Sequence, residues 1–226
     1  MVFSTILNSA LNALDMVFFS TLETLYMVFF STIFSMLIGF PIGILLVITK
    51  SGNIWEKPFL NKVLEVCVNT LRSFPFIILM ICVFPLSRLI VGTTIGVNAA
   101  IVPLSISAAP FVARMVEGAL NEIDKGLIEA SSSMGADNFT IIFKVMIPET
   151  LPHLIHGLTV TVISLIGYSA MAGTIGAGGL GDLAIRFGYQ RFKIDIMIYS
   201  VIVIIILVQI IQSFGNYLVK LSKKNK

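Results

Sequence analysis

The sequence is poor in charge. Only 12% of its 226 residues are Asp, Glu, Lys or Arg, whereas soluble domains carry about 25%. Apolar residues make up 57%, and the mean hydropathy is +0.98. A soluble globule of this size could not bury so much apolar surface, so the excess is expected to face lipid. A net charge of +3 also gives too small a phosphate footprint for nucleic-acid binding.

Motifs for catalysis, metal binding and disulfides are also missing. Cys67 and Cys82 are 15 residues apart, about 22 Å along a single helix, so no bridge is expected between them. His153 and His156 have no third metal ligand near them in the sequence. No Gly-x-x-x-x-Gly-Lys-Ser/Thr motif is present, so the chain is not expected to hydrolyse ATP itself. We expect no catalytic residue, metal or cofactor.

Long apolar stretches are what the sequence does contain. Crossing the hydrocarbon layer takes about 20 helical residues. The expected spans are residues 24–48, 66–87, 96–116, 153–175 and 196–218. Their continuous apolarity is not that of barrel strands, which alternate. We therefore predict an all-α, polytopic membrane protein with five transmembrane helices.

The distribution of Lys and Arg predicts the orientation. The first charged loop begins at Lys50, and the tail after residue 219 is basic. With five spans these two segments share a side, which the positive-inside rule makes cytoplasmic. The N-terminus is then outside. Only four of the 15 Lys and Arg residues fall on the outer side, at Arg88, Arg186, Arg191 and Lys193.

The N-terminal segment, residues 1–23, repeats apolar residues at steps of three and four. That spacing is typical of an amphipathic helix, which lies either along the outer interface or continuous with the first span. The expected division of the chain is this helix, a membrane domain over 24–220 and a basic cytoplasmic tail over 221–226.

Small and charged residues inside the spans suggest specific contacts. Gly39 and Gly43 make a Gly-x-x-x-Gly face in the first span, which predicts close helix packing. Arg114 lies near the cytoplasmic end of the third span, and Glu117 is three residues further on, within reach of an ion pair.

The loop between the third and fourth spans, about residues 118–151, has the most informative pattern. A short helix is expected from Leu127 to Met134, with Gly135 as a left-handed cap. Asp137 or Asn138 caps a second helix, and Pro148 is expected to stop it. This order predicts a rigid knob at the membrane face.

This pattern resembles the EAA loop of ABC-importer permeases. Glu129, Ala130, Gly135 and Pro148 match its register, and Ser131 replaces a second alanine. In that family the short helix docks on the ATP-hydrolysing subunit, so the resemblance implies a cytoplasmic coupling-helix loop here. The residues it implies for coupling to an ATPase are Glu129, Ala130, Ser131, Met134, Gly135 and Pro148.

A wider resemblance covers most of residues 24–220. The segments that carry it are residues 72–77, 100–104, 109–114, 167–171 and 176–181. They are similar to the methionine-uptake permeases, the small five-span members of the type I importers. The resemblance implies a homodimer, two ATP-binding ABC ATPase subunits, a substrate-binding lipoprotein and methionine as substrate, in the bacterial inner membrane. A permease for another amino acid or small solute, a membrane enzyme and a structural membrane protein remain as alternatives.

The fourth span has polar residues but no charge. Tyr168 and Met171 share a face, and with Ser169 they are the expected residues of a translocation pathway or gate. Ordinary helix packing is the competing interpretation. Five glycines between Gly173 and Gly181 predict a tight turn or irregular backbone at the outer mouth.

Overall fold

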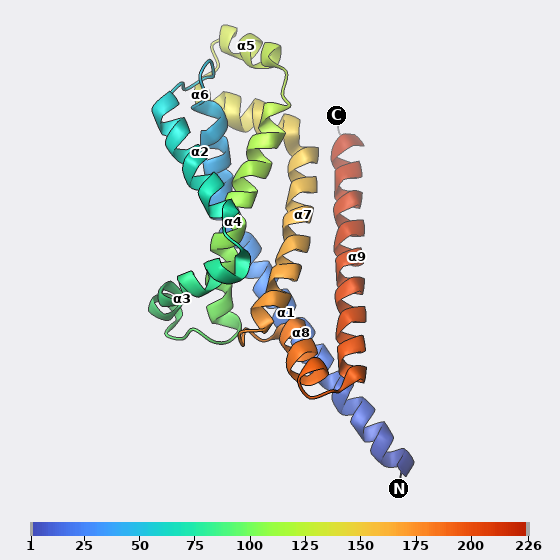
Figure 1. Ribbon diagram of the computed structural model, residues 1–226. Coiled ribbons are helices and arrows are strands. Elements are labelled where there is room, and N and C mark those ends of the chain that lie inside the picture. Colours follow the sequence, from blue (N-terminus) through green and yellow to red (C-terminus); the bar gives the residue numbers. More distant parts are fainter. Residues whose placement is uncertain (1, 225–226) are drawn as a thin grey trace. The chain divides into compact units, whose positions relative to one another are not determined.

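The computed structural model describes residues 2–224 of the chain, and the side chains of residues 13–223 (Figure 1). Those residues form helices and no strand. The helices are α1 (Val2–Ile48), α2 (Pro58–Ser73), α3 (Phe76–Val91), α4 (Val97–Asn121), α5 (Lys125–Ser133), α6 (Asn138–Thr140), the π-helix η1 (Ile141–Met146), α7 (Ile147–Gly173), α8 (Gly179–Asp182), the π-helix η2 (Leu183–Tyr189) and α9 (Ile194–Lys224).

Four helical stretches of the described chain are long and apolar enough to cross a membrane. They are Ala13–Ile48, Val97–Asn121, Asn138–Gly173 and Ile194–Lys223. A fifth span exists if α2 and α3 are counted together. The all-α membrane class is thus confirmed, and four of the expected spans overlap these helices, with only residues 96, 174 and 175 lying outside them.

The expected second span, residues 66–87, is not one helix. α2 ends at Ser73, and Phe74 and Pro75 are both extended, with ψ of 130° and 132°. A proline disfavours helical geometry in the residue before it and lacks the N–H that would continue the ladder. The helix therefore breaks at this pair and resumes at Phe76.

The chain forms two compact units, which we describe separately. The first comprises residues 1–33, 75–106 and 162–211, and the second comprises residues 34–74, 107–161 and 212–226. α1, α4, α7 and α9 each contribute residues to both units.

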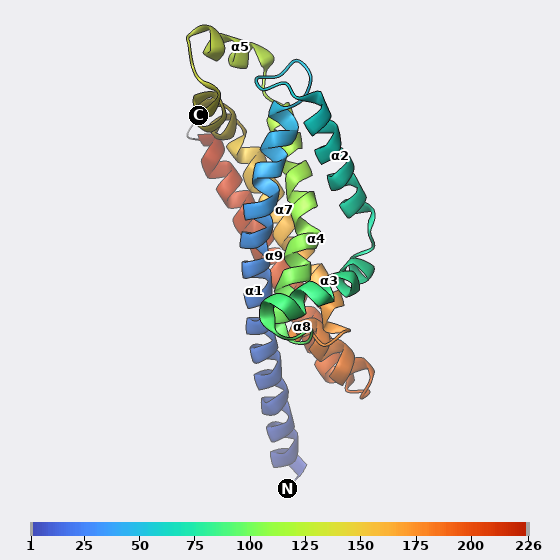
Figure 2. The same ribbon diagram turned by 90° about the vertical axis from the view of Figure 1, so that its left-hand side faces the viewer.

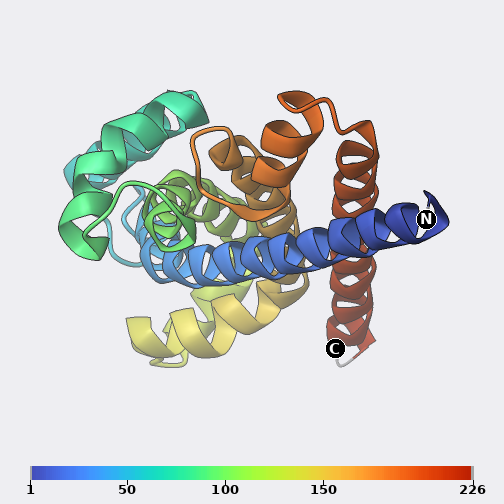
Figure 3. The ribbon, with the colours of Figure 1, turned by 90° about the horizontal axis from the view of Figure 1, so that it is seen from below.

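In the first unit, the N-terminal part of α1 crosses α9 (Figure 3). Ala13 and Val17 of α1 pack with Ile196 of α9 and with Leu180 and Leu183 of the α8–η2 segment in a buried cluster. α1 runs without interruption from residue 2 to residue 48, so helix continues from the N-terminal segment into the first span. The side chains of residues 1–12, on which the predicted amphipathic pattern partly depends, lie outside those described.

In the second unit, α1 packs against α4, and α2 lies beside both (Figures 1 and 2). Val47 of α1 and Val112 and Val116 of α4 belong to one buried cluster. The predicted glycine face makes the contact. A Cβ on Gly39 would lie 2.3 Å from the Ala109 carbonyl oxygen, and one on Gly43 would lie 2.6 Å from that of Ala113. Only glycine permits this approach.

The expectation that Pro148 stops a helix is wrong. Helical structure runs unbroken from Asn138 to Gly173. A proline in a regular α-helix clashes with the carbonyl four residues before it, which here is that of Lys144. Residues 141–146 instead form a π-helix, in which the Ile147 N–H donates to the Ile142 oxygen five residues earlier. The wider turn moves the preceding carbonyls away from the proline ring, so the helix continues.

Candidate functional site

The short helix α5 and the turn after it form the predicted knob. Asp124 caps the helix, because its carboxylate accepts a hydrogen bond from the Gly126 N–H at 2.8 Å. At the other end the Gly135 N–H donates to Ser132 O at 2.9 Å, and the Ala136 N–H donates to Ser131 O at 3.2 Å. These two bonds make a Schellman motif, which requires a left-handed residue. Gly135 supplies it, with φ of +82°.

The next helix is capped as the sequence predicts. The Asp137 carboxylate accepts from the Thr140 N–H at 3.3 Å. Hydrogen bonding from Thr140 lowers the pKa of Asp137, so the cap stays ionised. Helix α5 is capped at both ends, by Asp124 and by the turn at Gly135, and its Ile128 packs against the buried cluster of the second unit.

The predicted coupling residues fall into two groups. Glu129, Ala130, Met134 and Gly135 are exposed, and the Met134 side chain is 81% exposed. An apolar side chain so exposed, at the C-terminal cap of α5, suits a protein contact. These residues form the exposed tip of the knob.

Ser131 and Pro148 lie behind the tip. Ser131 is buried, and its hydroxyl donates to Leu127 O at 2.7 Å. It is therefore not on the exposed surface formed by the other residues implied for coupling on α5. Ser131 and Pro148 together line a groove, whose other lining residues are Leu127, Lys144, Val145, Glu149, Leu151, Ile155, Leu218, Leu221 and Ser222. At this groove α5 lies next to α7 and to the C-terminal end of α9.

The predicted gate residues lie at the C-terminal end of α7. Tyr168 stacks on Phe76 of α3, with ring centroids 4.7 Å apart and planes 9° apart. Met171 is 45% exposed. Ser169 is buried and donates its hydroxyl to Ile166 O at 2.8 Å, so it does not share the exposed face of Met171. The gate stays a prediction for all three residues.

The glycine-rich segment after α7 is a tight turn, as predicted. Gly178 and Gly179 both have positive φ, 85° and 78°. The turn is held from α1: the Glu23 carboxylate accepts from the Gly179 N–H at 2.7 Å, and the Thr24 hydroxyl accepts from the Leu180 N–H at 2.9 Å. Sequence reasoning missed Glu23 and Thr24, because 156 residues separate each bonded pair.

An acidic side chain is buried just beyond this turn. Asp182 pairs with Arg186 at 2.7 Å. Burial raises the pKa of the Asp182 carboxyl, Arg186 opposes that shift, and the nearby Glu23 adds to it. The segment after the turn is thus fixed by charge as well as by the backbone bonds to α1.

The predicted ion pair of Arg114 is present. Arg114 lies 2.5 Å from a carboxylate oxygen of Glu117 and donates to the Asn69 side chain at 2.7 Å, while Glu65 lies 3.7 Å away. The side chains of Arg114 and Glu117 are only 19% and 16% exposed. This cluster ties α4 to α2 inside the second unit.

A multi-span helical protein with an exposed, doubly capped helix between two spans is the architecture of a transport-system membrane component. Residues 39–224 match the family model described as the inner membrane component of binding-protein-dependent transport systems. The chain belongs to this family. It is a multi-pass protein of the inner membrane and a transport subunit, not an enzyme.

Individual relatives are also similar over most of the chain. A probable D-methionine transport system permease protein MetI of Vibrio cholerae is 52% identical over 183 residues, 81% of each chain. The methionine import system permease protein MetP of Bacillus subtilis is 49% identical over 180 residues, 80% of this chain and 81% of that one. An inward-facing structure of the MetNI methionine ABC transporter superposes with a TM-score of 0.91 at 46% identity, covering 92% of this chain and 97% of the other.

Proposed function

We propose that this chain is the permease subunit of an ATP-driven importer that carries methionine across the bacterial inner membrane. The observation that carries the proposal is the knob formed by α5 and Gly135, fixed at both ends and exposed at Met134. The names of the relatives support methionine as the substrate.

The partners follow from what the chain lacks. It has no nucleotide-binding motif in its sequence, so ATP hydrolysis belongs to a separate ABC ATPase subunit. The exposed tip of the knob is the surface that this subunit docks on. Five spans are too few to enclose a pathway alone, which favours a homodimer with a two-fold axis through the pathway and one ATPase for each permease. A substrate-binding lipoprotein delivers methionine from outside.

In the transport cycle the knob transmits the motion of the ATPase subunits to the permease. ATP-driven closure of the two ATPase subunits moves the knobs together and rocks the two bundles, so the pathway opens alternately outward and inward. Because α5 is short and capped, motion of its tip passes into the helices behind it rather than into bending of the loop.

The orientation that we propose has the N-terminus outside and the C-terminus in the cytoplasm, as the Lys and Arg distribution favours. With Cys67 and Cys82 replaced by serine, Thr93→Cys should react with an impermeant thiol reagent in intact cells. Lys223→Cys, in the exposed basic tail, should react only after permeabilisation. The opposite labelling would overturn this orientation.

We place the outer gate at Met171, with Tyr168 beside it. In a symmetric dimer the residue nearest the axis meets its own copy. A single Met171→Cys variant, again without Cys67 and Cys82, should form an oxidant-induced dimer whose yield changes with ATP, because a disulfide needs Cα atoms within about 7 Å. If no disulfide-linked dimer forms in any nucleotide state, Met171 does not lie at the two-fold axis.

The proposed function is tested by transport. The chain, its ATPase subunit and the binding protein are reconstituted in vesicles, and uptake of labelled methionine is measured with and without ATP. The expected result is ATP-dependent uptake that unlabelled methionine suppresses and other amino acids do not. Uptake of another solute in place of methionine would assign this permease to a different substrate.

A further inference from the structure

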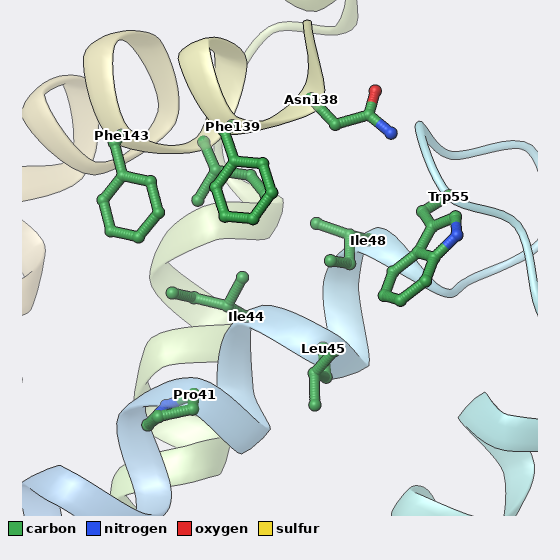
Figure 4. A pocket seen from close by; sticks show the side chains of 9 residues that line it. Pro41, Ile44, Leu45, Ile48, Trp55, Asn138, Phe139 and Phe143 are labelled. Carbon is green, nitrogen blue, oxygen red and sulfur yellow. The ribbon is translucent and has the colours of Figure 1, made fainter.

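A groove of about 380 Å³ lies beside the C-terminal end of α1, in the second unit (Figure 4). α1, the loop after it, α6 and η1 form its walls. The lining residues are Pro41, Ile44, Leu45, Ile48, Trp55, Asn138, Phe139, Ile142 and Phe143. Among these nine residues only Asn138 carries a polar side chain. Nothing in the proposed transport cycle uses this groove.

The wall formed by α6 and η1 is aromatic and exposed. The rings of Phe139 and Phe143 stack with centroids 6.3 Å apart and planes 6° apart. Their side chains are 74% and 56% exposed. Two adjacent aromatic rings so exposed would be unfavourable in water, because each offers a large apolar surface. Next to hydrocarbon they are favourable, so this wall is suited to contact an acyl chain.

The other end of the groove has the features of a membrane interface. Trp55 is the single tryptophan of the chain, and tryptophan concentrates at the level of lipid headgroups. The Lys57 ammonium lies 4.3 Å from the centre of its ring. The Lys57 N–H donates to Thr49 O at 2.9 Å, which holds this loop against the end of α1 beside Lys50.

Charged side chains of both signs lie at this end. The Lys57 ammonium is held at the groove by the Trp55 ring, whereas the Glu56 carboxylate accepts from the Ser51 hydroxyl at 2.5 Å and the Asp137 carboxylate caps α6. The groove runs from a polar end with Trp55 and Asn138, beside the Lys57 ammonium, to an apolar end with Pro41 and Phe143 (Figure 4). A phospholipid has the same polarity, an anionic phosphate at one end and hydrocarbon beyond it.

We propose that this groove binds one anionic phospholipid, with an acyl chain against Phe139 and Phe143 and the phosphate beside Lys57. Its volume lies within the range of about 300–1,000 Å³ that is typical of small-molecule sites. The lipid is the occupant that the position favours, because the groove is on the last turns of a membrane-spanning helix at the level where Trp55 marks the interface. The proposal rests on the membrane topology and not on the substrate.

The single tryptophan gives a direct test. The assembled complex is reconstituted in phosphatidylcholine vesicles in which a fixed fraction of the lipid is replaced by brominated phosphatidylglycerol or brominated phosphatidylcholine. Bromine quenches tryptophan on contact, and a Trp55→Phe complex provides the signal to subtract for other chains. We expect brominated phosphatidylglycerol to bind about fivefold more tightly than brominated phosphatidylcholine, as measured by quenching of Trp55, because one lysine near an anionic lipid provides a preference of this size. The preference should be lost in Lys57→Gln.

The apolar end is tested with matched aromatic substitutions. Phe139→Ala with Phe143→Ala should weaken quenching by both lipids, because the acyl chain loses its wall. Phe214→Ala is the control, since Phe214 on α9 is 61% exposed and is not part of the groove. Equal quenching by the two brominated lipids in the unaltered complex would overturn the anionic assignment. Weaker quenching of Trp55 in the assembled complex than in the permease reconstituted without its ATPase subunit would mean that protein covers the groove, and would overturn the proposal.

Discussion

Replacement of Gly135 by valine tests the backbone geometry of the knob separately from its side-chain contacts. No atom lies within 4 Å of a Cβ built on Gly135, so the added side chain has room. The cost comes from φ, which is +82°. A residue other than glycine pays about 1–2 kcal/mol for left-handed geometry, and a β-branched residue is at the upper end. We expect Gly135→Val to lower the population of the docked conformation by about 5- to 30-fold.

The assay is the affinity of the purified permease for its ATPase subunit, together with ATP-dependent uptake in vesicles. Both should fall, while the amount of permease inserted in the membrane stays unchanged. Gly135→Asn is the control, because asparagine adopts left-handed geometry with little penalty. It should retain most of the affinity.

Two results would refute this reasoning. If Gly135→Val binds the ATPase subunit as tightly as the unaltered chain, the Schellman turn does not position the docking surface. If Gly135→Asn is as defective as Gly135→Val, the interface needs the absence of a side chain at this position, and backbone geometry is not the cause.

Three further predictions concern packing, charge and the outer turn, and each is measured as thermal stability in detergent. Gly39→Ala should destabilise the protein by about 1–3 kcal/mol, because overpacking forces α1 away from α4. The control is Gly118→Ala, which has no atom within 4 Å of the new Cβ and should be neutral or stabilise its helix by up to about 1 kcal/mol. Equal effects of the two substitutions would mean that α1 and α4 are not in close contact at Gly39. Arg114→Met should destabilise the protein by less than the about 3–5 kcal/mol that breaking a fully buried ion pair costs. Glu117→Gln should destabilise it less still, because Arg114 keeps Asn69 and Glu65 as polar neighbours. An unchanged stability in both variants would show that the cluster does not stabilise the fold. Glu23→Ala should lower the stability by about 1–3 kcal/mol, because it leaves the Gly179 N–H without its acceptor. Glu23→Gln keeps an acceptor oxygen and should lower the stability less. Equal losses of stability in the two variants would argue against the Glu23–Gly179 hydrogen bond.

The parts of the structure that the sequence predicted are those set by neighbouring residues. The cap at Asp137 and the left-handed turn at Gly135 depend on contacts within five residues, so the pattern of residue types was sufficient. Close packing of α1 was predicted from Gly39 and Gly43, because two glycines four residues apart leave a helix face without side chains; that α4 is the partner came from the structure.

The parts that it did not predict depend on distant contacts or on rare helix geometry. Glu23 meets the glycine turn across 156 residues, and no local pattern identifies such a partner. The π-helix at residues 141–146 accommodates Pro148, although a proline usually ends a helix. The break before Pro75 did leave a local signal, because a proline restricts the residue that precedes it, but the apolar run on both sides favoured a single span.

The central claim, that the tip of α5 is where an ATPase subunit docks, is tested most directly by crosslinking. A photoreactive p-benzoylphenylalanine replaces Met134, which is 81% exposed, and the complete transporter is irradiated in its membrane. The same probe at Thr93, in the exposed segment between α3 and α4, is the control. We expect an adduct with the ATPase subunit from the probe at position 134 and none from the probe at position 93. Irradiation that yields no adduct with the ATPase subunit from Met134, in a complex that is active in uptake, would contradict it.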